Sequence, residues 1–245
     1  MTRTAELQKT LKALRLSGML DTLDARLLQA NNGDFGHFEF LQALCEDELN
    51  RRSSASISRK IKDAHFETIS TLEEFDFSYN PKLPASAIRD LGTLHFLDKG
   101  ESVILYGPVG VGKTHLAQAL GHLACRRGHN TVFLKTSRLL SNLAGGHADQ
   151  TFESRIKILQ KPDILIFDDF AMRQFTNTQS DDLYELISER RDKSNIFTSN
   201  RTPSDWYQLF PNPVVAESLL DRIINKSHKI EIEGKSFRPM NQPKT

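Results

Sequence analysis

The sequence predicts an α/β fold, a three-layer αβα domain with a mostly parallel sheet, preceded by a small all-helical domain. Three observations support this prediction. From residue 85 onward, short apolar runs alternate with amphipathic helical segments. One of these runs leads directly into a glycine-rich loop and then into a helix. The first 66 residues, in contrast, show only the spacing of helices.

Residues 1–66 are expected to form the helical N-terminal domain, because apolar residues recur there at near-helical spacing. Asn31–Asp34 is expected to separate two helical segments. A linker follows at 67–84, where Asn80–Pro84 favours extended or turn geometry, and the nucleotide-binding domain occupies 85–245. The apolar residues that define the two helical segments are Leu7, Leu11, Leu14, Leu16 and Leu20 in the first, and Phe38, Leu41, Leu44, Cys45 and Leu49 in the second.

The region from residue 85 is typical of successive βαβ units, which give a parallel sheet with helices on both faces. Several of the expected strands are continuous apolar runs, as in strands that are covered on both sides. The strands are expected at 102–106, 130–135, 164–167, 195–199 and 228–232, with helices at about 114–127, 137–144, 151–160, 179–192, 203–209 and 214–225.

The loop after the first of these strands carries the most specific motif in the chain. It fits G-x-x-x-x-G-K-[ST], in which the glycines let backbone N–H groups surround an anion, the lysine neutralises the outer phosphates and the hydroxyl binds Mg²⁺. The strand–loop–helix order also directs a helix N-terminus at a phosphate. We therefore expect a nucleotide triphosphate to contact Gly107, Pro108, Val109, Gly110, Val111, Gly112, Lys113, Thr114 and the adjacent His115.

Two later strands end in polar residues that suit the same chemistry. Asp168 and Asp169 follow an apolar run, so Asp168 is expected to hold Mg²⁺ together with Thr114, and Asp169 to orient the attacking water. Asn200 follows another apolar run and is expected to reach the γ-phosphate or the water if its strand lies between the loop and Asp168. Taken singly, a solvated acidic pair and an ordinary turn are the simpler interpretations.

Composition limits the possible partners and compartments. The formal net charge is +1, so a surface for nucleic acid has to be local. The two cysteines lie far apart in expected helices and are interpreted as reduced, buried thiols. The N-terminus is polar, and no apolar run is long enough to span a bilayer. We expect a cytoplasmic protein with no membrane partner.

The densest basic cluster lies near the end of the N-terminal domain. On a helix over 49–64, four of its five side chains share an arc of about 100°, with Ile57, Ile61 and Ala64 on the opposing side. Such a face suits the phosphates of duplex DNA, although many charged helical faces are only solvated. The cluster consists of Arg51, Arg52, Arg59, Lys60 and Lys62.

The order of these motifs resembles the AAA+ ATPases: Gly107–Thr114, Ile164–Asp169, Thr198–Arg201 with Trp206, and Leu219–Arg222. More narrowly, the whole chain resembles the IstB group, the ATP-dependent helpers of IS21-type transposases, which are related to the helicase loader DnaC. The resemblance implies that Lys113 and its loop are the Walker A motif, and that Asp168 and Asp169 are Walker B. It implies that Asn200 is sensor 1, and that Arg222 reaches the γ-phosphate bound by a neighbouring subunit.

The resemblance further implies an ATPase that binds ATP and Mg²⁺, forms a nucleotide-dependent homo-oligomer as a ring or spiral, remodels duplex target DNA and stimulates the transposase of its own element. The N-terminal domain would supply contacts to DNA, partners or other copies. Asp169 in place of the more common glutamate, and the expected absence of a C-terminal lid, which Arg238 is not expected to replace, both favour slow intrinsic turnover.

Other interpretations remain open. A DnaC-like loader of a replicative helicase would use the same ATPase on a different client. A small-molecule kinase would need an acceptor pocket, and a DNA-binding module with an inactive nucleotide fold would not need Lys113. Phe75 and Phe77 either flank the adenine ring or fasten the linker to the core.

Overall fold

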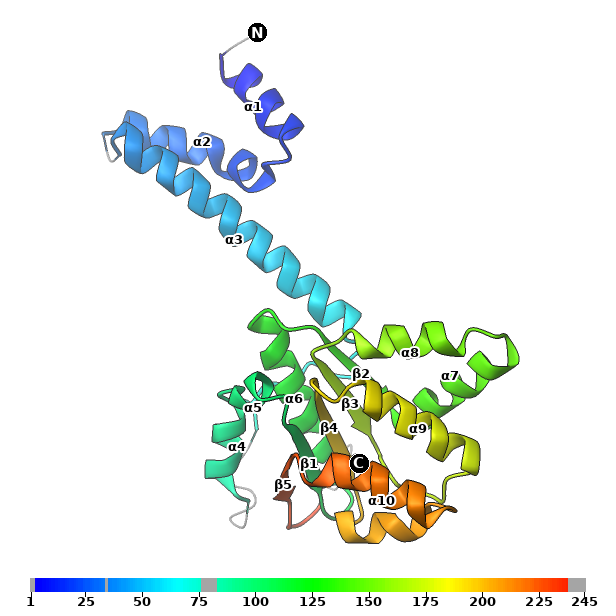
Figure 1. Ribbon diagram of the computed structural model, residues 1–245. Helices are drawn as coiled ribbons and strands as arrows, with labels where there is room; N and C mark the ends of the chain where they lie inside the picture. The colour runs from blue at the N-terminus through cyan, green and yellow to red at the C-terminus, as the bar shows by residue number, and fades with distance from the viewer. Residues whose placement is uncertain (1–2, 34, 76–82, 238–245) are drawn as a thin grey trace, which may run out of the picture. The chain divides into compact units, whose positions relative to one another are not determined.

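The computed structural model describes residues 3–33, 35–75 and 83–237, and it confirms the α/β fold with a helical N-terminal region (Figure 1). The chain divides into two compact units, and the boundary along the sequence lies between Arg59 and Lys60. The boundary expected near residue 66 therefore falls in the second unit. Phe77 and Asn80–Lys82 of the expected linker lie outside the described residues, and so does Arg238 near the C-terminus.

The N-terminal unit contains α1 (Arg3–Ala13), α2 (Ser17–Asn31) and the first part of α3 (His37–Asp63). The leucine spacing predicted one helix before Asn31, and this is wrong: Arg15, with φ of 58°, ends the first helix and redirects the chain. The helices α2 and α3 approach closely at Gly18, which has no side chain. A Cβ at this position would lie 2.7 Å from Glu48 Cα. Glu48, which is buried, accepts a hydrogen bond of 2.6 Å from Gly18 N.

The second unit is built on a five-stranded parallel sheet with the order β2-β3-β4-β1-β5 (Figure 1). Its strands agree with the sequence prediction to within one residue at each end. Since β4 lies between β1 and β3, the loops that follow these three strands meet at one edge of the sheet. The strands are β1 (Ser102–Tyr106), β2 (Thr131–Lys135), β3 (Ile164–Asp168), β4 (Ser194–Ser199) and β5 (Ser227–Glu231).

Helices cover both faces of this sheet, as expected for parallel strands. The predicted segment at 203–209 forms a 3-10 helix, η1, before which the N–H and the hydroxyl of Thr202 donate to Asp205 Oδ2 at 3.3 and 2.8 Å. The spacing patterns did not indicate α4 and α5, which are only a turn or two long. The helices are α4 (Ala85–Leu91), α5 (His95–Asp98), α6 (Lys113–Arg126), α7 (Thr136–Ala148), α8 (Phe152–Gln160), α9 (Asn177–Glu189), η1 (Pro203–Leu209) and α10 (Pro213–Ile224).

The apolar strands divide their side chains between two cores. Along β3, Ile164 and Ile166 pack with α4, α5 and α6, while Leu165 and Phe167 pack with α7 to α10. This division follows from the period of two residues along a strand. All four side chains are fully buried. The double burial keeps the carboxyl ends of the strands in register, and those ends carry the polar residues of the site.

A buried arginine holds the opposite end of the sheet, where the strands begin. Arg190, 1% exposed, donates to Asn195 Oδ1 at 2.8 Å and to the carbonyl oxygens of Leu159, Pro162 and Ser194 at 2.7, 3.0 and 2.9 Å. Burial lowers the pKa of Arg190 to about 10, so the side chain remains cationic at neutral pH. It joins the ends of α8 and α9 to the starts of β3 and β4.

Candidate nucleotide-binding site

The loop Gly107–Gly112 connects the end of β1 to the start of α6. Gly107, Gly110 and Gly112 have φ values of 141°, 83° and 97°, a region that favours glycine. A Cβ at Gly107 would lie 2.1 Å from the carbonyl oxygen of Ile232, so no side chain fits there. The loop therefore has the backbone freedom to direct consecutive N–H groups at an anion.

Lys113 begins α6 and lies over this loop. Its ammonium group donates to the carbonyl oxygens of Gly107 at 2.8 Å and Pro108 at 2.6 Å, and the residue is only 6% exposed. These contacts place a buried positive charge within the loop that is to hold the phosphates. A cation and a helix N-terminus together favour a polyphosphate.

The acidic end of the site lies on β3. Asp168, 2% exposed, accepts hydrogen bonds through Oδ1 from Thr114 Oγ1 at 2.8 Å and Thr198 Oγ1 at 2.6 Å. Burial raises the pKa of Asp168, the two hydroxyl groups oppose this shift, and the charges of Asp169 and Glu67 add to it. The structure thus brings together the two residues predicted to hold the metal.

The donor set fits Mg²⁺. A hydroxyl oxygen and a carboxylate oxygen face each other at the start of α6, and hard oxygen ligands are those that Mg²⁺ prefers. Thr114 and Asp168 would hold the ion, which would supply charge neutralisation for the phosphates.

Asp169 leaves the strand in an unusual conformation. Its φ of 55° is left-handed, which costs about 1 kcal/mol or more for a residue other than glycine. Thr198 on β4 holds this turn: Asp169 N donates to Thr198 Oγ1 at 3.0 Å, and Phe170 N to Thr198 O at 2.8 Å. Sequence reasoning gave Thr198 no role of its own, although it begins one of the quoted motifs. The available signal was a hydroxyl residue at the end of an apolar strand.

Asn200 follows β4, the strand between β1 and β3, as the prediction required. Its side-chain amide lies 3.1 Å from Met172 Sδ, in the segment after β3. The backbone position therefore suits a sensor of the γ-phosphate. The role itself remains a prediction.

Phe75 packs against the phosphate loop. The residue is 7% exposed, and a Cβ at Gly112 would lie 3.1 Å from its ring. His115 lies beside it, with ring centroids 5.6 Å apart. This arrangement corresponds to the packing alternative for Phe75, which fastens the chain before α4 to the loop.

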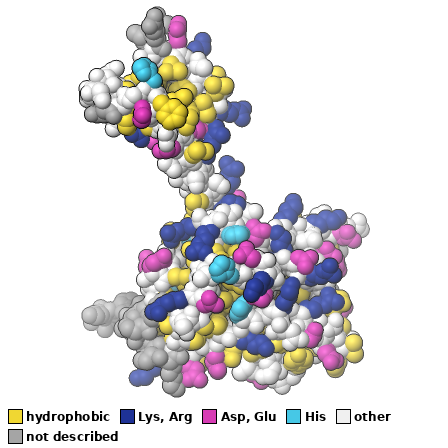
Figure 2. All heavy atoms as spheres, turned by 60° about the vertical axis from the view of Figure 1, so that its left-hand side comes forward, with side chains coloured by type: hydrophobic (Ala, Val, Ile, Leu, Met, Phe, Trp, Pro, Cys, Tyr) yellow, Lys and Arg dark blue, Asp and Glu magenta, His cyan; other side chains and the backbone are white. Residues whose placement is uncertain are grey.

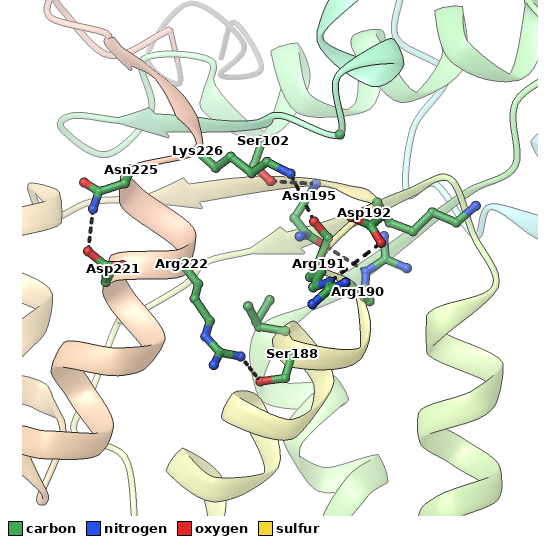
Figure 3. Close-up of a pocket in the computed structure, with 13 residues that line it drawn as sticks. Ser102, Ser188, Arg190, Arg191, Asp192, Asn195, Asp221, Arg222, Asn225 and Lys226 are labelled. Atoms are coloured by element: carbon green, nitrogen blue, oxygen red, sulfur yellow. Dashed lines mark hydrogen bonds and ion pairs between the residues drawn. The ribbon is translucent and has the colours of Figure 1, made fainter.

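The structure places Arg222 away from the other predicted site residues of the same chain. It lies at the end of α10 and donates to Ser188 Oγ and, at 3.1 Å, to Tyr184 Oη, with its guanidinium 4.8 Å from the centroid of the Tyr184 ring. It lines a cavity of about 730 Å³ with Ser102 and other residues (Figure 3). Ser102 begins β1, whereas the phosphate loop follows its last residue, so Arg222 is at the opposite edge of the sheet.

The five basic residues of the predicted DNA cluster all lie on α3. In the N-terminal unit, Arg51 lies 3.4 Å from Asp21 and Arg52 lies 2.6 Å from Glu48. In the second unit, Lys60 donates to Asn130 Oδ1 at 2.6 Å. Among the residues that the structure describes, Arg59 and Lys62 have no ion-pair partner.

Replacing Asp168 with asparagine is expected to stabilise the metal-free protein at pH 7. The raised pKa of Asp168 means that its charged form is disfavoured in the folded state, so wild-type stability falls as pH rises from the ordinary pKa of 3.8 through the folded value. The variant lacks this penalty. Urea unfolding in EDTA should show a higher midpoint for the variant at pH 7 and equal midpoints below pH 3.8. A lower midpoint for the variant at pH 7 would contradict this assignment.

The fold and the loop define a P-loop nucleotide-binding protein of the AAA+ type. In no part of 3–33, 35–75 or 83–237 does a helix have the length and apolarity to cross a membrane. The family of IstB-like ATP-binding proteins matches residues 9–245. This chain belongs to that family.

Relatives named as ATP-binding proteins of insertion sequences support this membership. One from Mycobacterium tuberculosis (strain ATCC 25618 / H37Rv) is 61% identical over 239 residues, covering 97% of this chain and 95% of the relative. The IS21 protein of Pseudomonas aeruginosa is 32% identical, covering 95% and 88%.

Solved structures with the same fold are more distant in sequence. The DnaC helicase loader has a TM-score of 0.56 at 20% identity, over 71% of this chain and 99% of that one. The replication initiator DnaA, bound to AMPPCP and single-stranded DNA, has a TM-score of 0.58 at 20% identity, over 70% and 52%. This similarity establishes the fold.

Proposed function

We propose that this protein is an ATP-hydrolysing, DNA-binding regulator of transposition that assembles through its bound nucleotide and stimulates the transposase of its own insertion sequence. The observation that carries the proposal is the convergence of Thr114, Asp168 and Asp169 next to a glycine loop with a buried lysine. The names of the insertion-sequence relatives supply the biological setting. A cytoplasmic location suits such a role.

The roles of the residues follow from their positions. Lys113 binds the β- and γ-phosphates, Thr114 and Asp168 hold Mg²⁺, and Asp169 orients the attacking water. Asn200, at the end of the intervening strand, contacts the γ-phosphate. ATP is thereby hydrolysed to ADP and phosphate.

The position of Arg222 favours action on a neighbouring copy. Its guanidinium is at the edge of the sheet away from its own phosphate loop, so it neutralises transition-state charge only where two copies meet. Hydrolysis then depends on assembly, which suits a homo-oligomeric ring or spiral.

The N-terminal unit offers surface for partners. Figure 2 shows hydrophobic side chains on it, and large apolar residues there are exposed: Leu14 61%, Leu28 62%, Phe38 75%, Leu41 58% and Leu49 65%. Exposed apolar surface of this kind is typical of interaction sites. The basic residues of α3, of which Arg51, Arg52 and Arg59 belong to this unit, provide a contact for duplex phosphates.

Fluorescence anisotropy with linear duplex DNA tests the proposal. We expect tight binding with ATP and weak binding with ADP. The double variant Arg59→Ala, Lys62→Ala should lose about tenfold in affinity and reduce the salt dependence by about two counterions. Lys157→Ala on α8, which also removes an exposed charge, serves as the control. Equal duplex affinity with and without nucleotide would contradict the proposal.

A helicase loader is the second candidate, favoured by the shared fold of the DnaC loader. The two functions differ in their client. Co-purification with the replicative helicase, and not with the transposase encoded beside the gene, would select the loader.

A further inference from the structure

The segment Ala64–Phe75, which follows α3, belongs to the second unit and contacts the rest of that unit at several points. Phe133 N on β2 donates to Ala64 O at 2.8 Å. The N–H groups of Glu67 and Thr68 donate to Gln118 Oε1 on α6 at 2.8 and 3.1 Å. The segment therefore runs from the edge strand β2, across α6, to the phosphate loop that Phe75 touches.

One ion pair on this segment reaches toward the site. Glu67 Oε1 lies 2.9 Å from Lys135 Nζ, and Lys135 is the last residue of β2, directly in register with Asp168 on β3. The two side chains are 40% and 37% exposed. Exposed pairs contribute only about 0–1 kcal/mol to stability, so this pair is not needed to hold the fold.

The ammonium group of Lys135 lies within electrostatic reach of the acidic pair as well. Its hydrogen bond to Glu67 raises the pKa of Lys135 most, and the charges of Glu67, Asp168 and Asp169 raise it further. One cation thus has three carboxylates near it, and its ion pair is with Glu67. The other two are the residues that are to hold the metal and orient the water.

We infer that Glu67 is a positioning residue for ATP hydrolysis, because it binds Lys135 and so keeps the ammonium from pairing with Asp169. This inference rests on the proposed function. If the ammonium group of Lys135 paired with Asp169, that ion pair would fix the carboxylate of Asp169. The carboxylate could then no longer orient the attacking water.

The inference is tested by steady-state phosphate release from the full chain with Mg·ATP, using Glu67→Gln, Lys135→Met and the double variant. We expect Glu67→Gln to lower kcat about fivefold in the wild-type background with KM unchanged. In the Lys135→Met background the same change should have no effect, because no ammonium remains to be released. Glu101→Gln, which breaks the 2.7 Å pair with His228 at the other edge of the sheet, is the matched control and should leave kcat unchanged.

The outcomes separate the two proposals. If the wild type releases no phosphate, the proposed hydrolysis fails. If the wild type is active and Glu67→Gln leaves kcat unchanged, or lowers kcat equally with and without Lys135, the inference is overturned. Unfolding midpoints of all variants show whether folding contributes, and a loss of kcat that follows a loss of stability also counts against the inference.

Discussion

Replacing Arg222 with alanine is expected to lower kcat for ATP hydrolysis about a thousandfold while leaving the affinity for ATP unchanged. The guanidinium lies at the sheet edge opposite its own phosphate loop, held by Ser188 and Tyr184. It therefore contributes nothing to binding within one chain. Under the proposed function, it acts only on the transition state in a neighbouring chain. Phosphate release and calorimetric ATP binding measure the two quantities separately.

Mixing two inactive variants provides the decisive control. Asp169→Asn retains Arg222 but lacks the residue proposed to orient the attacking water, so it should restore part of the activity of Arg222→Ala when the two are combined. Arg191→Ala removes a neighbouring exposed arginine from the same cavity and should leave kcat within about twofold of wild type. Failure of the mixture to regain activity would argue that Arg222 acts within its own chain or only through folding.

Replacing Lys113 with alanine is expected to weaken ATP binding about a hundredfold, or about 2.7 kcal/mol, because a buried charge-assisted contact to the phosphates is lost. Calorimetry with Mg·ATP measures this loss. Electron microscopy with ATP and linear duplex should show assemblies for the wild type and none for the variant.

Three further outcomes bear on this prediction. Lys113→Ala should still unfold cooperatively, since its amine donates to the carbonyl groups of Gly107 and Pro108 in an exposed-edge loop and not to the apolar cores described above. Oligomers on DNA that persist unchanged in Lys113→Ala would break the link between nucleotide and assembly. Undiminished ATP binding by Lys113→Ala would show that this loop does not bind the nucleotide.

The sequence predicted those parts of the fold and site that depend on local patterns. The ends of β1 to β4 were predicted well because each strand contains successive apolar residues and is followed by a polar residue or a glycine, whereas β5 is mostly polar and is followed by Ile232. The break at Arg15 was not, because the leucine spacing continues across it. Helices of one or two turns, such as α5, carry too few residues for a period to be visible.

Features that join distant parts of the chain could not be read from local patterns. The strand order, with β4 between β1 and β3, depends on which strands pair. The support that Thr198 gives to the turn at Asp169 depends on that order. The pair of Glu67 and Lys135 joins a linker to a strand end, and neither residue belongs to a motif.

The placement of the phosphate loop and Arg222 at opposite edges of one sheet gives each copy two unlike ends. Copies that join through the nucleotide must then associate head to tail, as heterologous contacts do. In an open filament, the last nucleotide faces no arginine and the first arginine faces no nucleotide. Turnover per copy should therefore rise with filament length and level off, whereas a closed ring has no such idle end.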